Sequence, residues 1–217
     1  MERQIIDIPR VFMRAMSFDW DIDWRGQSAG EGNEGEQIVF NRQPRFIGSP
    51  QLVLGRDMLP YWRALRARAE GRRNAWRVAM VDPLGFSFRR GSYRADWAAW
   101  LSGNYVEPRP QILCAGAAAA GASSILVDER MAERPVRVGA FLSHADWPFL
   151  VIGRSTEGTF ARLEVKMLRR AIPAGAAIDL EARGLFIGTS DTMGAAPYTH
   201  VGLPRTQLEL IEWITRP

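Results

Sequence analysis

Ser143, His144 and Asp146 are the residues of this chain whose types and closeness in sequence could support hydrolysis. A serine nucleophile needs a histidine base that a third group orients, and the three side chains must converge in space. Nearness along one turn does not supply that convergence, and the chain has neither a G-x-S-x-G elbow nor an H-E-x-x-H helix. With only His144 and His200 available, we expect turn or surface histidines and no enzymatic activity.

Asp19, Asp21 and Asp23 occupy alternate positions and could offer carboxylates to a metal ion. A calcium-binding loop of the EF-hand type, however, has turn residues and a glycine between its ligands. Here Trp20 and Ile22 intervene in the register of a strand, which places the three carboxylates on one face. We therefore expect no metal site, and interpret the three residues as a solvated or partner-facing acidic strand face.

Two further features bear on cofactors, and neither predicts one. Residues 153–158 read G-R-S-T-E-G, which lacks the lysine and the spacing of a P-loop and predicts a hairpin turn instead. Cys114 is the single cysteine, so this chain alone can form no intrachain disulfide and no cysteine-ligated metal cluster. The fold must therefore be stabilised by packing.

The charge pattern gives only a mild signal for nucleic acid. The chain has 28 basic and 24 acidic residues, and a nucleic-acid-binding protein would carry a basic stripe with interleaved aromatic residues. No apolar run approaches the roughly 20 residues that span a membrane, and the first residues lack the layout of a secretory signal. We expect synthesis in the cytoplasm, no membrane insertion and no specificity for nucleic acid. The one dense basic stretch contains Arg63, Arg66, Arg68, Arg72 and Arg73.

Period-two alternation predicts strands in the first half of the chain. Within residues 10–24 the even positions include six apolar side chains, at positions 12, 16, 18, 20, 22 and 24, and residues 76–80 alternate in the same way. Residues 25–36 are rich in glycine and glutamate and contain no apolar residue larger than alanine, which predicts a mobile loop. A further strand is expected at residues 38–40.

One segment, residues 57–70, has the pattern of a helix. Asp57 is a candidate N-cap, and Gly71 lies where a C-terminal cap would be. The apolar side chains recur at helical spacing, so we expect this helix to lie on a sheet. They are Met58, Trp62, Leu65 and Ala69.

A second β-region is predicted after a linker at residues 107–110. In its clearest strand, residues 159–167, apolar and charged side chains alternate as in a half-buried strand. Residues 206–214 are strand-like, and we expect them to return to the N-terminal sheet, which would make the second domain an insertion. The other strands of the region are expected at residues 124–127, 136–141, 149–152, 177–180 and 185–188.

The charged and aromatic residues point to contacts with other proteins. Arg63 and Arg66 lie largely off the apolar face of the helix, and we hypothesise that this arginine face meets the acidic strand of a neighbouring copy. Trp97 and Trp100 lie outside the expected strands. Three interpretations of the pair remain open, namely a sugar-binding platform, an anchor between subunits and ordinary core.

Two stretches of the chain resemble the distal-tail and minor tail proteins of long-tailed bacteriophages. The first joins the helix segment 62–72 to V-D-P-L-G at residues 81–85. The second lies in the later β-region and resembles the second β-domain of the family. It comprises residues 138–141, 147–151, 163–165, 168–171 and 184–186.

The resemblance implies a mainly β fold with two barrel-like or sandwich-like domains and one helix packed on the N-terminal sheet. Residues 1–106, with residues 203–217 as a returning strand, would form a ring-forming domain, and residues 111–202 a peripheral one. It implies a structural virion protein at the tail tip, in a homo-oligomeric ring of six or three copies. The ring would join the tail tube protein to the tail-tip hub and receptor-binding proteins, without catalysis or cofactor. The alternative is a β-sandwich module that binds carbohydrate through Trp97, Trp100 or Tyr198.

Overall fold

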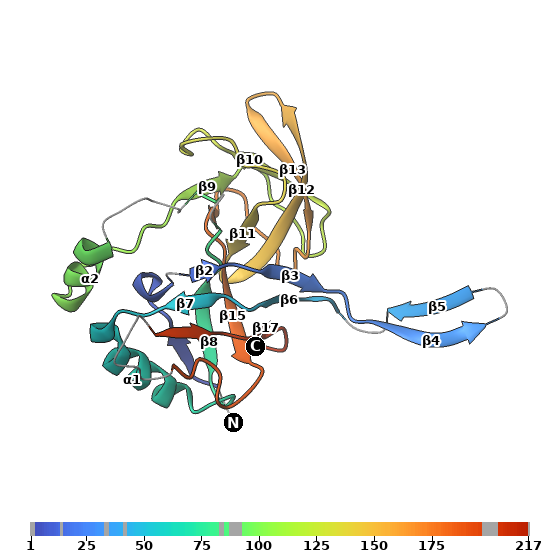
Figure 1. Cartoon of the computed structure of the whole chain (residues 1–217). Helices are drawn as coiled ribbons and strands as arrows, with labels where there is room; N and C mark the ends of the chain where they lie inside the picture. The colour runs from blue at the N-terminus through green and yellow to red at the C-terminus, as the bar shows by residue number, and fades with distance from the viewer. Residues whose placement is uncertain are drawn as a thin grey trace.

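The protein is mainly β and consists of a closed barrel, a larger mixed sheet and a projecting two-stranded arm (Figure 1). The computed structural model describes residues 3–13, 15–32, 35–40, 43–82, 85–86, 93–196 and 204–216. The predicted fold class is therefore confirmed. No helix in these described ranges is long and apolar enough to cross a membrane.

The mixed sheet has six strands, of which only β1 and β8 run parallel to each other. A three-stranded sheet of β16 (Arg205–Gln207), β7 (Gln51–Val53) and β2 (Ala15–Ser17) shares its hydrophobic core. Successive side chains of a pleated strand point to opposite faces of the sheet. Phe46, Trp76 and Phe186 lie on the face that packs into this core. In spatial order the six strands are β1 (Ile5–Asp7), β8 (Ala75–Ala79), β15 (Arg183–Gly188), β17 (Leu210–Glu212), β6 (Arg45–Gly48) and β3 (Trp20–Asp23).

Helix α1 (Leu59–Ala69) packs on this core, as the sequence predicts. Its Trp62 is 2% exposed and stacks on Trp76 of β8, with ring centroids 6.2 Å apart. The predicted caps differ: Asp57 lies within a preceding 3-10 turn, η2 (Arg56–Met58), and Glu70 adopts the left-handed C-cap conformation expected of Gly71. Gly71 is also left-handed, with φ of 65°, so the chain reverses over two residues.

A second helix, α2 (Tyr93–Leu101), and the 3-10 turn η1 (Arg10–Phe12) were not predicted. The single strand expected over residues 10–24 is divided into η1, β2 and β3. Apolar residues at even positions are shared by these elements, so alternation alone did not reveal the breaks between them.

The barrel closes in the order β10-β13-β12-β11-β14-β9 around its own core. Strand β13 shows the predicted alternation, since Ala161, Leu163 and Val165 are all buried. The chain runs from the mixed sheet through the barrel and back, so the barrel is inserted between β8 and β15, which pair with each other. The barrel strands are β9 (Gln111–Cys114), β10 (Ser124–Asp128), β11 (Phe141–His144), β12 (Trp147–Glu157), β13 (Phe160–Lys166) and β14 (Ala177–Asp179).

Three predictions in this half, two of strands and one of a turn, are corrected. Residues 136–140 form no strand, because Gly139 makes a turn with φ of 89° immediately before β11. The turn expected at residues 153–158 is mostly strand, since β12 continues to Glu157 and the chain reverses at Gly158. The strand expected at residues 185–188 belongs to the mixed sheet as β15, because backbone pairing with β8 and β17 determines its sheet. The return of residues 206–214 is present, with β16 paired to β7 and β17 to β6.

Candidate assembly surface

The arm consists of β4 (Gly26–Gly32) and β5 (Gly35–Phe40), inserted between the neighbouring strands β3 and β6. It projects away from the rest of the molecule (Figure 1) and forms a sheet of its own. The loop predicted for residues 25–36 is therefore wrong, because backbone pairing from Gly26 and Phe40 onward orders the segment without large apolar side chains. A lone two-stranded hairpin is marginally stable in water, so a projecting arm of this kind is suited to a partner surface.

The mixed sheet also has two edge strands. Strands β1 and β3 lie at its two ends, and each pairs on one side only within the described part of the chain. Such edges can template pairing with another chain, and charged side chains restrict which chain can pair. Asp21 and Asp23 place carboxylates on β3.

The three predicted aspartates do not form one free acidic face. Asp19 accepts a hydrogen bond from the Ser49 N–H at 2.8 Å, and Asp23 forms an ion pair with Arg45 at 3.0 Å. Asp21 is exposed, and its carboxylate accepts the N–H of the next residue at 2.7 Å. Among the described residues, no group of three acidic, histidine or cysteine side chains could hold a metal ion.

The two helix arginines are placed differently from each other. Arg66 donates its Nε–H to the Met193 carbonyl at 2.9 Å and its Nη2 to the Thr192 carbonyl at 3.2 Å. It therefore fastens a loop of its own chain, whereas Arg63 is exposed on α1. Pairing between the acidic strand and this helix in neighbouring copies stays a prediction, with Arg66 and Asp23 already engaged internally.

Trp97 and Trp100 belong to an aromatic cluster at the junction of α2, η1 and α1. Their rings stack with centroids 5.0 Å apart, and each meets Phe12 edge-on at 5.6 and 5.5 Å. Trp97 is only 5% exposed, which leaves it no open face for a sugar ring. Tyr198, the third aromatic residue of the carbohydrate hypothesis, lies outside the described residues.

The three residues considered for hydrolysis serve separate partners. Ser143 is fully buried, and its Oγ accepts the Arg183 N–H at 2.8 Å. His144 Nδ1 lies 2.9 Å from the Ala177 carbonyl, and Asp146 pairs with Arg77 at 2.9 Å. The structure therefore does not bring them together as a triad.

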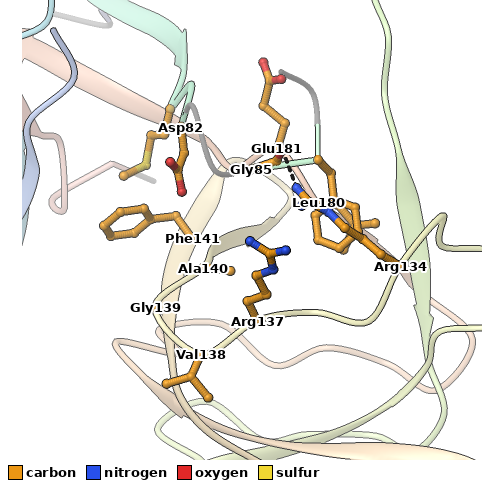
Figure 2. A pocket seen from close by; sticks show the side chains of 12 residues that line it. Asp82, Gly85, Arg134, Arg137, Val138, Gly139, Ala140, Phe141, Leu180 and Glu181 are labelled. Carbon is orange, nitrogen blue, oxygen red and sulfur yellow. Dashed lines mark hydrogen bonds between the residues drawn. The ribbon is translucent and has the colours of Figure 1, made fainter. Parts of the chain in front are cut away.

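A cavity of about 170 Å³ lies where the barrel meets the mixed sheet (Figure 2). Arg137 extends toward its middle, and Arg134 donates to the Gly85 carbonyl at 2.7 Å. Glu181 lines the cavity and pairs with Arg10 at 2.8 Å. Burial raises the pKa of Glu181 to about 7, against the opposing effect of the Arg10 charge. The contacts of Arg134 and Glu181 therefore connect the barrel and its linking segments to the rest of the chain.

A second, larger hollow lies over the mixed sheet and was not foreseen from the sequence. This arginine groove, of about 670 Å³, has Ile187, Ile211 and Trp213 among its lining residues. Ile187 and Ile211 are register partners, and they alternate with the buried Phe186 and Leu210, so they face away from the core. Its basic residues are far apart in the chain and meet only through strand pairing. They are Arg3, Arg25, Arg45 and Arg72.

No protein-family model matches the chain, and no curated protein matches it.

Proposed function

We propose that this chain is a structural subunit that assembles with copies of itself into a ring. The observation that carries the proposal is the projecting arm, whose two strands pair only with each other in the described part of the chain. An arm reaching from one subunit to the next makes a head-to-tail contact. Such contacts generate closed rings when the rotation between subunits closes.

The second part of the proposal is the setting, a ring of six or three copies at the distal end of a long-tailed bacteriophage tail. It rests on the sequence resemblance described above and on the agreement between the implied architecture and the barrel, sheet and flanking helix. In this setting the ring joins the tail tube to the tail-tip hub and the receptor-binding proteins. The chain acts by assembly, without catalysis.

The inserted barrel is suited to hold neighbouring tail components in a fixed orientation relative to the ring. Three ion pairs join it and its connections to the mixed sheet and η1: Arg10 with Glu181, Arg77 with Asp146, and Arg169 with Glu212. Phe46 of β6 also meets Phe141 of β11 edge-on, with centroids 5.9 Å apart. Several contacts across one junction restrict relative motion, so a partner on the barrel would be held relative to the ring.

Light scattering on the purified full-length chain, followed by negative-stain microscopy, tests this function. We expect a concentration-dependent mass of six or three protomers and ring-shaped particles. Particles with a central opening that joins end to end with phage tail tubes would support the tail setting. A strict monomer over the whole accessible concentration range that also fails to bind tail tubes would overturn the proposal.

The carbohydrate-binding alternative has less support. A sugar platform needs an exposed aromatic face, whereas Trp97 is buried and stacks on the partly buried Trp100. Binding of the monomeric chain to a glycan array would nevertheless favour that class over a ring subunit.

A further inference from the structure

The arginine groove carries more positive charge than its own carboxylates offset. Arg45 is paired with Asp23 at 3.0 Å, and Arg72 with Asp191 at 3.0 Å. The Glu212 side chain is fully buried and paired with Arg169, so its carboxylate is not available to a groove arginine. Two guanidinium groups, those of Arg3 and Arg25, have no carboxylate partner within the ranges that the structure describes.

Arg3 is held in place by neutral groups. Its Nη1 donates to the carbonyls of Arg72 and Arg73, the latter at 2.7 Å, and its guanidinium lies 5.9 Å from the centre of the Trp213 ring. Carbonyls and an aromatic ring orient the cation but leave its charge in place. The groove thus combines an apolar floor with a fixed positive excess, which suits an acidic segment carrying some apolar side chains.

The arm has the complementary composition. Residues 26–40 contain three glutamates and no lysine or arginine, and they end in I-V-F. Glu31 of β4 and Glu36 of β5 are direct register partners. The arm is therefore acidic in composition, which complements a surface that carries a positive excess.

The arm's position favours another molecule as the source of that positive surface. The arm continues outward from β3 and β6 and points away from the sheet that bears its own chain's groove (Figure 1). The groove spans strands β15, β17 and β6, about 10 Å across two strand spacings. The two strands of an arm are about 5 Å apart, so the backbone of an arm is narrower than the span of the groove.

From this complementarity we infer that the arm of one copy docks into the arginine groove of the next copy, where the negative charge of the arm offsets the positive charge of Arg3 and Arg25. The inference rests on the proposed function, because it names the two surfaces through which the ring closes. It also explains why an acidic, glycine-rich segment projects beside a basic groove. The contact is heterologous, so each subunit offers one arm and one groove.

Crosslinking between full-length copies tests the contact without requiring a stable ring. One protein carries Gln37→Cys on the arm, and a second, tagged protein carries Thr189→Cys in the groove; a short bismaleimide joins cysteines that come close. Met131→Cys is the matched control, because Met131 is 83% exposed and lies on the barrel connection away from the groove. The chain without added cysteine is the blank, since Cys114 is buried.

We expect crosslinking of the arm and groove proteins, with the Met131→Cys control at background. Arg3→Glu with Arg25→Glu in the groove protein should lower the crosslinked fraction on the order of tenfold. Glu31→Lys with Glu36→Lys in the arm protein should restore it only against the reversed groove. Circular dichroism checks that each variant is folded.

The outcomes separate the contact from the ring. Background crosslinking, or crosslinking that charge reversal leaves unchanged, overturns the docking of the arm in the groove. If light scattering still shows rings in that case, the proposed function stands and another surface closes them. Charge-dependent crosslinking without any ring would support the contact and count against the ring.

Discussion

Removing the buried carboxylate of Glu212 should destabilise the whole molecule. The Glu212 side chain has no exposed surface and contacts Arg169 at 3.0 and 3.2 Å. It also accepts the Phe46 N–H at 2.9 Å. One carboxylate thereby joins β17 and β6 of the mixed sheet to the segment that follows β13 of the barrel. Glu212→Ala removes all of these contacts at once.

The size of the loss in stability follows from the two groups that Glu212→Ala leaves without a partner, the Arg169 charge and the Phe46 N–H. Breaking a buried ion pair by deleting one partner costs about 3–5 kcal/mol, because the other charge stays buried without compensation. Arg169 is 13% exposed, so water compensates little of its charge. The orphaned Phe46 N–H adds about 1–3 kcal/mol. Since the two losses overlap, we expect Glu212→Ala to lower the free energy of unfolding by about 4 kcal/mol.

A double-mutant cycle separates the charge from the hydrogen bond. Glu212→Gln keeps an acceptor for the Phe46 N–H but leaves Arg169 unpaired, so we expect a loss of about 3 kcal/mol. Adding Arg169→Met removes the unpaired cation, and most of that loss should be recovered. The exposed pair Arg162 with Glu157 is the control, and Arg162→Met there should cost less than about 1 kcal/mol.

Urea unfolding followed by the fluorescence of the eight tryptophans measures all these variants. A loss below about 1 kcal/mol for Glu212→Ala would refute the reasoning. So would a double mutant in which the two single losses simply add, because the coupling between the charges would then be absent.

Two further predictions concern the junctions. Burial raises the pKa of Glu181 from 4.5 to about 7, so the folded state holds this proton more tightly. The resulting contribution to stability is full below pH 4.5 and is lost as pH rises from 4.5 through 7. Over that range the loss is at most about 3 kcal/mol, and the urea midpoint of Glu181→Gln should depend less on pH than that of the native chain; equal slopes would contradict the shift. Trp97→Ala should cost about 3 kcal/mol by removing its contacts with Phe12 and Trp100 and expose α2 to limited proteolysis, whereas an unchanged cleavage rate would show that α2 does not depend on this cluster.

The sequence predicted those strands and helices whose apolar residues repeat at a regular spacing. Strand β13 alternates apolar and polar residues, and α1 repeats its apolar residues at helical spacing, so each pattern indicates one buried face. Helix α2 carried a weaker signal, the spacing of three residues between Trp97 and Trp100, which places both side chains on one helical face. One pair at this spacing is too short a pattern to define a helix, so the sequence alone did not reveal α2.

The arm and the groove could not be predicted in the same way. The arm contains few apolar side chains, and its order comes from backbone hydrogen bonds between β4 and β5. The groove arginines come from four separate parts of the chain, and only the pairing of distant strands brings them together. Strand partners are set by contacts remote in sequence, which is also why β15 was assigned to the wrong sheet.

The insertion of the barrel makes the mixed sheet depend on it. Strands β8 and β15 are neighbours in that sheet, yet the chain between them contains α2 and the whole barrel. Forming the β8–β15 pair therefore closes a loop of more than 100 residues, which costs several kcal/mol of chain entropy in an unfolded connection. A barrel that is already folded brings its own two ends close together and so reduces that cost. A variant that loosens the barrel should thus also weaken the sheet that carries the arm and the groove, although neither surface contacts the altered residue.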